Sequence, residues 1–237
     1  MIPIRLESAW RGTSDCRKCG IRDMVLFADL NEEDFNLIHA PIDDFAYQPG
    51  QVLYEESAKA LGVFTLRQGM LKLVRFTADG RERVVRVLFP GDVVGLEALA
   101  TQHYDSQAVA LSEVFVCRIP LEVVHQLGSN SPRLHRKLME KWQSALKQAD
   151  DWLADLNFGS ARQRVHHFIR KMHEIAGDGT ATLFSRDDMG AMMDLKLETV
   201  SREVTALVRS GVLQPIDKQG RHYRVLQPQH LESGGQE

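Results

Sequence analysis

Apolar and polar residues alternate with a helical period near the C-terminus of the chain. Ser185, followed by Asp188 and the apolar Met189, is the pattern of a capped helix start. After a break at residues 194–196, apolar residues return at helical spacing over residues 197–208. Two helices joined by so short a turn predict a helix-turn-helix.

The polar face of the second helix carries Glu198, Ser201 and Arg202 in its N-terminal half. Arg can bind guanine through two hydrogen bonds and Glu can accept one from cytosine, so these groups suit the reading of a major groove. Gly211 then ends the helix, and residues 212–225 read as a β-hairpin, which completes a winged module. The simpler interpretation, for the two helices alone, is an antiparallel pair with a solvated charged face.

The middle of the chain, from residue 45 to residue 120, shows short apolar segments punctuated by glycine turns. No helical pattern between them is long enough for crossover connections, so an antiparallel barrel or jelly roll is expected. The predicted strands are 52–54, 63–66, 71–76, 83–89 and 108–119.

Helical patterns flank this region. A short helix is expected over residues 31–42, a long one over 131–157 and a further amphipathic one over 161–176. The long helix has an apolar seam with charged flanks, which favours a coiled-coil contact with a second copy over a buried core helix. The seam consists of Leu134, Leu138, Trp142, Ala145, Ala149, Trp152 and Leu156.

Together these patterns predict an α+β chain with four parts. An N-terminal segment spans 1–30, an antiparallel β-roll sensor domain 31–128, a dimerisation helix 129–158 and a winged helix-turn-helix domain 159–237. A length of 237 residues is enough for two domains.

Composition places the chain among soluble globular proteins, with 43% hydrophobic and 26% charged residues. It lacks an apolar run of membrane-spanning length and the apolar core of a signal peptide, so a cytoplasmic protein without a membrane partner is expected. The net charge of −3 alone argues against nucleic acid, but residues 160–226 hold more Lys and Arg than Asp and Glu. The basic excess therefore falls on the part with the helix-turn-helix.

Three cysteines are an odd number, and a reducing cytoplasm disfavours a structural disulfide. Cys16 and Cys19 have the spacing that lets two thiolates reach one metal. That spacing also occurs in redox pairs, so the motif by itself does not decide between the two.

The order of β-roll, long helix and winged helix-turn-helix resembles the CRP/FNR superfamily of bacterial transcription regulators over nearly the whole chain. The marks are Gly69, the Phe-Pro-Gly-Asp turn at 89–92 followed by Gly95, and the string Glu-Thr-Val-Ser-Arg at 198–202. That string is similar to the E-x-x-S-R signature of the FNR branch, whose members read TTGAT-type half-sites.

The resemblance implies a homodimeric regulator rather than an enzyme. It would bind palindromic double-stranded DNA, respond to oxygen or redox state, and act with RNA polymerase, mostly as an activator. The DNA-contacting residues expected from the resemblance and the wing are Glu198, Thr199, Ser201, Arg202, Lys196, Arg186, Lys218 and Arg221.

The resemblance also bears on cofactors. Members that bind cyclic AMP hold its phosphate with an Arg-Ser pair, where this chain has Asp105 and Ser106. A carboxylate in place of the arginine would repel a cyclic phosphate, so no cyclic nucleotide is expected.

Oxygen-sensing members hold a [4Fe–4S] cluster on three N-terminal cysteines and one in the roll. Cys16, Cys19 and Cys117 match three of the four, and the missing position falls at Val25. The resemblance therefore implies a cluster whose fourth iron is bound by another group, Asp23 or Asp15 being the nearest oxygen ligands. The alternative is that Cys117 is a buried strand residue and the N-terminal pair is a vestige or a redox pair.

Other modes of action stay open. The same fold could sense through haem or thiol oxidation, or act as a constitutive dimer without a cofactor, because Ala149 stands where the resembling sensors carry an aspartate that opposes dimerisation. From a different class, a metal-dependent β-roll enzyme with a DNA-binding domain would need His and carboxylate ligands clustered in the strands. His103 stands alone there.

Overall fold

The computed structural model describes residues 21, 24–35, 38 and 40–232, and the chain divides into two compact units. The first unit comprises Met1–Phe76 and Val85–Lys147, and the second comprises Thr77–Val84 and Gln148–Glu237. No helix in the described ranges combines the length and the apolar character needed to cross a membrane.

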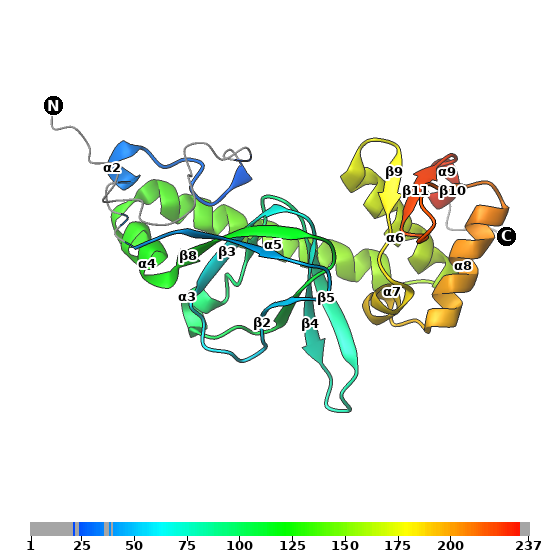
Figure 1. Ribbon diagram of the computed structural model, residues 1–237, viewed down its shortest axis with the longest axis horizontal. Helices are drawn as coiled ribbons and strands as arrows, with labels where there is room; N and C mark the ends of the chain where they lie inside the picture. Colours follow the sequence, from blue (N-terminus) through cyan, green and yellow to red (C-terminus); the bar gives the residue numbers. More distant parts are fainter. Residues whose placement is uncertain (1–20, 22–23, 36–37, 39, 233–237) are drawn as a thin grey trace. The chain divides into compact units, whose positions relative to one another are not determined.

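The first unit is built on two four-stranded sheets with antiparallel pairing, in the orders β1-β8-β3-β6 and β2-β7-β4-β5 (Figure 1). This confirms the predicted antiparallel roll. The strands are β1 (Asp43–Tyr47), β2 (Val52–Tyr54), β3 (Gly62–Gln68), β4 (Leu71–Phe76), β5 (Glu82–Leu88), β6 (Val93–Val94), β7 (Gln107–Ala110) and β8 (Val114–Pro120). The residues of β5 up to Val84 are counted with the second unit.

The single strand predicted over residues 108–119 is wrong, because it is two strands, β7 and β8, that belong to different sheets. The apolar pattern continues through the turn between them, since Ala110 and Val114 are both buried. Gly69 packs against this turn with a φ of +85°, and a Cβ there would lie 2.1 Å from the carbonyl oxygen of Glu113. Only glycine fits so close an approach.

Side chains alternate across β8 and supply two separate cores. Val114 and Val116 belong to the core between the two sheets, whereas Cys117 and Ile119 face an outer core. The outer core also includes apolar residues of the segment 25–42 and of two helices. The helices of this unit are α2 (Glu32–Phe35), α3 (Ala98–Thr101), α4 (Leu121–Asn130) and α5 (Pro132–Asn157), the last being shared with the second unit.

The helices before and after the roll match the prediction only in part. The helix expected over 31–42 is confined to α2, which Asn31 caps by accepting a hydrogen bond from the backbone N of Asp34 (3.0 Å). The long helix is confirmed as α5, but α4 precedes it and was not predicted.

One face of α5 carries three cations, spaced four residues apart, that bind other parts of the first unit. A spacing of four places them on the same side of the helix. The contacts are Arg133 Nε with the Asp34 carboxylate (2.9 Å), Lys137 Nζ with that of Asp29 (3.5 Å), and Lys141 Nζ with the carbonyl oxygens of Met24 and Gly91 (2.6 Å each).

The second unit holds a helix-turn-helix and a three-stranded antiparallel sheet in the order β10-β11-β9. The hairpin was predicted, but the third strand, β9, was not. Ser160 and Gln163 form a capping box that starts α6 at the predicted residue. The elements are α6 (Ala161–Ala176), β9 (Thr180–Thr182), α7 (Arg186–Met193), α8 (Leu197–Arg209), β10 (Leu213–Pro215), β11 (His222–Val225) and α9 (Gln229–Glu232).

Candidate nucleic-acid interface

The start of α7, its end at Asp194 and a close backbone contact fix the turn between α7 and α8. Ser185 caps α7 by accepting a hydrogen bond from the backbone N of Asp188 (3.0 Å). Asp194 ends the helix in the left-handed conformation, with a φ of 55°. A Cβ at Gly190 would lie 2.6 Å from the carbonyl oxygen of Leu195, so the turn passes directly over this glycine.

The two faces of α8 differ as the sequence predicts. Val200, Val204 and Leu207 are buried, whereas Glu198 and Arg202 are exposed. Two further predicted contacts, Thr199 and Ser201, are half-buried. Leu197 was expected on the apolar face but is 41% exposed, because it lies at the first residue of α8, before the packed part begins. Glu198 and Arg202, the exposed members of the predicted contact set on this helix, thus lie in its N-terminal half.

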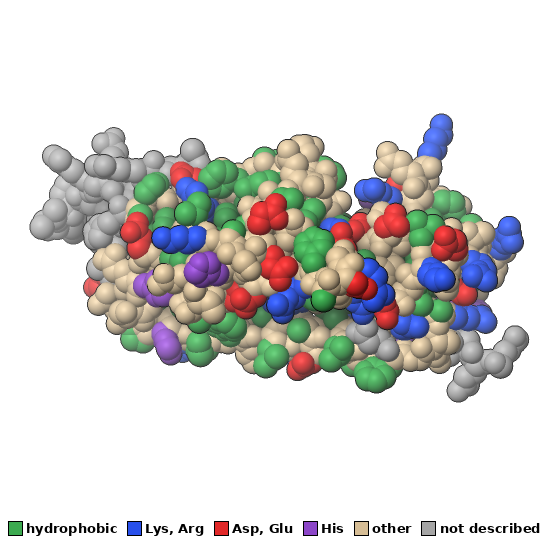
Figure 2. Space-filling view, turned by 90° about the horizontal axis from the view of Figure 1, so that it is seen from below, with side chains coloured by type: hydrophobic (Ala, Val, Ile, Leu, Met, Phe, Trp, Pro, Cys, Tyr) green, Lys and Arg blue, Asp and Glu red, His purple; other side chains and the backbone are tan. Residues whose placement is uncertain are grey.

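Exposed basic side chains lie just before α8 and in the loop of the hairpin that follows it. Lys196 precedes α8 and is exposed, and Lys218 and Arg221 are exposed between β10 and β11, in the loop that we call the wing tip (residues 216–221). Figure 2 shows Lys and Arg side chains gathered over the second unit on the face in view. Arg186 differs from these, because it is half-buried and hydrogen-bonds to residues at and beside the wing tip.

The predicted dimer seam of α5 is divided between two faces of the helix. Leu138, Trp152 and Leu156 are buried inside the single chain, and Ala145 packs against the outer core. The ring of Trp152 packs against that of Phe168, with 6.2 Å between the ring centroids. Leu134, also in the predicted seam, is fully buried in the outer core, so five of the seven predicted seam residues already have packing partners within the chain.

A second stripe on α5 stays exposed. Trp142 is 38% exposed, and the side chains of Met139, Leu146 and Leu153 are more than half exposed. Ala149 is half-buried in the same register. The steps of three and four residues between these positions form the seam of a coiled coil. Of the predicted seam, Trp142 and Ala149 lie on this exposed stripe.

Cys117 is the predicted metal ligand that the structure describes, and Cys16, Cys19, Asp15 and Asp23 lie outside the described residues. Its side chain is 8% exposed and faces the outer core. Asp44 is its cross-strand partner on β1. Within the described ranges, no group of three or more His, Cys, Asp or Glu side chains is arranged to hold a metal.

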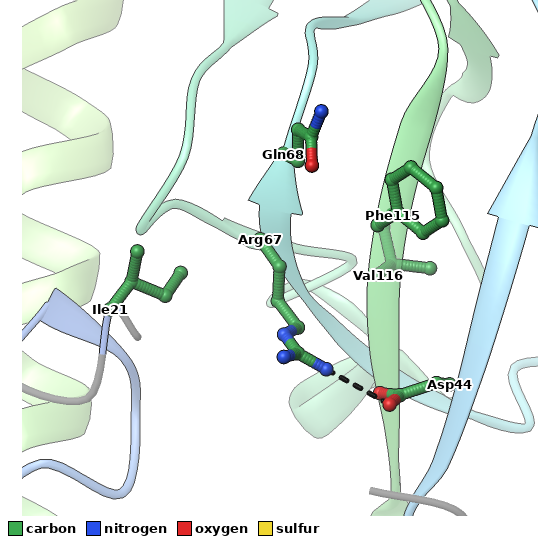
Figure 3. A pocket seen from close by; sticks show the side chains of 6 residues that line it. All are labelled: Ile21, Asp44, Arg67, Gln68, Phe115 and Val116. Carbon is green, nitrogen blue, oxygen red and sulfur yellow. Dashed lines mark hydrogen bonds and ion pairs between the residues drawn. The ribbon is translucent and has the colours of Figure 1, made fainter. Parts of the chain in front are cut away.

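A cavity of about 270 Å³ lies beside Cys117 on the same sheet. Figure 3 shows Arg67 and Asp44 pointing toward each other across it, with Arg67 Nη1 at 2.9 Å from the Asp44 carboxylate. Phe115 and Val116, which directly precede Cys117, form another wall. The residues that line the cavity are Ile21, Asp44, Arg67, Gln68, Phe115 and Val116.

The interior of the roll contains aromatic and charged groups. The rings of Tyr54 and Tyr104 stack at 3.7 Å, and Tyr104 donates a hydrogen bond to the carbonyl oxygen of Gly62 (2.7 Å). Burial raises the pKa of Glu97 and lowers the pKa of Arg86. No sequence motif singled out Arg86, which lies on β5 between Val85 and Val87.

Two family models match the chain. The cyclic nucleotide-binding domain matches residues 45–131, and the Crp-like helix-turn-helix domain matches residues 163–233. The matches coincide with the roll and the winged module.

Among curated relatives, the fumarate nitrate reduction regulatory protein of Klebsiella oxytoca is 28% identical over 205 residues, which cover 84% of this chain and 82% of that protein. The anaerobic regulatory protein of Haemophilus influenzae is 26% identical over 220 residues, covering 89% and 83%. Among solved structures, FixK2 from Bradyrhizobium japonicum has a TM-score of 0.74 at 26% identity, covering 82% of this chain and 97% of that one.

Proposed function

Because this chain belongs to the CRP/FNR family of transcription regulators, in its FNR-like branch, we propose that it activates transcription as a dimer bound to palindromic DNA in response to oxygen or redox state. Its relatives and structural neighbours are transcription regulators, not enzymes. The metal-dependent enzyme considered from the sequence is therefore set aside.

The observation that carries the proposal is the exposed polar face of α8. Glu198, Ser201 and Arg202 project from a helix whose opposite face is buried, next to a wing tip with exposed basic groups. A helix placed in this way can insert into the major groove while the wing contacts the backbone. Arg202 is assigned to a guanine and Lys218 to a phosphate.

Arg202→Ala is expected to weaken binding to the specific site by about 1–3 kcal/mol and to relax the preference at one base position. The reason is the loss of two hydrogen bonds to a single base edge. Binding titrations on the specific site, on single-base variants of it and on random DNA measure the effect.

Lys218→Ala is the matched control, because it also removes one positive charge. It should weaken specific and random binding alike and lower the slope of log K against log salt by about one. An equal loss for Arg202→Ala on specific and random DNA would reassign Arg202 to a phosphate.

The dimer is proposed to form along the exposed stripe of α5, with Trp142 and Leu146 near its middle. Large apolar side chains exposed at coiled-coil spacing need a partner surface, and a second copy offers the same stripe. α5 is also shared by the two units, so a change in the roll could reach α8 through it. Activation through RNA polymerase rests on the likeness to the named regulators alone.

For the signal, we propose a [4Fe–4S] cluster held by Cys16, Cys19 and Cys117. Cys117 suits this role because it faces the outer core, which the N-terminal segment also enters through Leu26 and Phe27. When bound, such a cluster supplies oxygen-sensitive redox chemistry. Haem binding and thiol oxidation of Cys16 and Cys19 are the second candidates, and a visible–ultraviolet spectrum of anaerobically purified protein separates them.

Anaerobic reconstitution is expected to give iron and sulfide below full stoichiometry, both lost on brief exposure to air. A fourth ligand such as Asp23 or Asp15 is a harder and weaker partner for iron than a thiolate. Cys117→Ser should abolish the bound iron, and Asp23→Ala should reduce it if Asp23 is the fourth ligand. Iron and sulfide assays measure both, and unchanged oxygen-dependent transcription in Cys117→Ser would refute the cluster.

Cyclic nucleotides are proposed not to be the signal. The stacked rings of Tyr54 and Tyr104 occupy the interior of the roll, and the carboxylate of Asp105 stands where related proteins place a phosphate-binding arginine.

A further inference from the structure

A side-chain link joins the first turn of α7 to the wing. Nη2 of Arg186 lies 3.0 Å from the hydroxyl oxygen of Tyr223 and 3.4 Å from the carbonyl oxygen of Gly220. We infer that Arg186 and Tyr223 form a strut that sets the position of the wing tip relative to the helix-turn-helix. The inference rests on the proposed DNA binding and assigns Arg186 a positioning role instead of the direct DNA contact expected from the sequence.

Tyr223 is a firm anchor for this strut. It lies in β11, the central strand of its sheet, opposite Pro215 on one side and Ala181 on the other. The residue is only 5% exposed, so the ring is fixed by packing and its hydroxyl has little freedom. A planar guanidinium held by this hydroxyl and by a backbone carbonyl is fixed in direction as well as in distance.

Hydrogen bonds to Asp217 within the loop also stabilise the wing tip. Its carboxylate accepts hydrogen bonds from the backbone N of Arg221 (3.0 Å) and of His222 (3.2 Å). Gly220 closes the turn with a φ of +64°, and a Cβ there would lie 3.2 Å from the Tyr223 hydroxyl oxygen. The internal bonds of Asp217 shape the loop, and the strut connects the shaped loop to α7.

This connection matters for the two exposed cations of the wing tip, Lys218 and Arg221. Few apolar contacts hold a loop of this kind, and without the strut its cations would have to be ordered when DNA binds. Fixing them beforehand removes that entropic cost from binding. The strut should therefore control how many phosphates the wing contacts while leaving base reading by α8 intact.

Tyr223→Phe tests the inference because it removes the hydroxyl without changing any charge. If the strut positions the wing, the slope of log K against log salt falls by about one to two, since each lost phosphate contact contributes about 0.9. Lys218→Ala should then cost little further affinity in the Tyr223→Phe protein. Arg186→Ala removes both the strut and a charge, so it should lower the slope by more than one. Arg224→Ala is the control, because it removes an exposed charge from β11, the strand of Tyr223, without touching the strut. It should lower the slope by no more than about one.

An unchanged slope in Tyr223→Phe, together with a loss of about one in Arg186→Ala, would overturn the strut and make Arg186 a plain phosphate contact. Amide exchange of residues 216–221 in the absence of DNA provides a second measurement. Exchange should become faster in both variants at unchanged melting temperature, and unchanged exchange would also overturn the inference. If the parent protein binds no DNA, the proposed function fails, but amide exchange still decides the strut.

Discussion

Replacing Leu146 by glutamate is expected to convert the protein to a monomer and to weaken binding to a palindromic site by about 100-fold or more. The side chain is 64% exposed and lies midway along the stripe that begins at Met139 and Trp142. In a two-fold dimer each substitution acts twice, placing two like charges in an apolar seam. Losing the second half-site removes the gain from bivalent binding, which is on the order of 100-fold to 10,000-fold.

Sedimentation velocity at micromolar concentration, with DNA titrations on one and two half-sites, measures both effects. Ser144→Glu is the matched control, because Ser144 is exposed on α5 and lies about half a turn of the helix away from Leu146. It adds the same charge and should leave the dimer intact. The metal-free parent should also be a dimer, since Ala149 contributes no repelling charge, and a monomeric parent would contradict the proposed interface.

The difference between the predicted and the exposed seam shows what periodicity can and cannot decide. Helical spacing identifies apolar positions, but α5 has apolar groups on two faces, and spacing does not say which face packs inside the chain. Leu138 and Leu156 pack against residues of the same chain. Leu146 has charged residues near it in the sequence and is not part of the predicted seam, yet its side chain is exposed. The decision depends on residues distant in sequence, such as Phe168 against Trp152.

The same limit explains the strand errors. β9 is only three residues long, Thr180–Thr182, and exists because β11 offers it a free edge. β7 and β8 were merged because their turn contains no glycine or proline to mark it. Where the local chemistry is strong, as at Ser160 and Ser185, the helix starts were correct to the residue. Site residues are subject to the same limit. The sequence predicts that Arg186 contacts DNA, because nothing near it in the sequence indicates its hydrogen bond to Tyr223.

Gly190→Ala is expected to destabilise the second unit by about 3 kcal/mol and to abolish DNA binding at concentrations that saturate the parent. In an ordinary helix this change would stabilise by about 1 kcal/mol, because alanine is the better helix former. Here the new Cβ would lie 2.6 Å from the carbonyl oxygen of Leu195, a distance that requires movement of the backbone.

The turn has little freedom to move away. The carbonyl oxygen of Gly190 accepts hydrogen bonds from the backbone N of Asp194 and of Leu195 (3.0 Å for the latter), so a shift of the turn breaks the bonds that define it. The clash therefore outweighs the gain in helix propensity, and α8 loses its position relative to α7.

Gly128→Ala in α4 is the matched control for this argument. Its new Cβ would meet only the Cδ1 atom of Leu138 at 3.9 Å, which is an ordinary contact, so the helix propensity should prevail and stability should rise by up to about 1 kcal/mol. Calorimetric unfolding of the full chain, with DNA titrations, compares the two variants. Because both exchange glycine for alanine inside a helix, opposite signs would isolate the close approach of the turn as the cause, and equal signs would show that the turn adapts without cost.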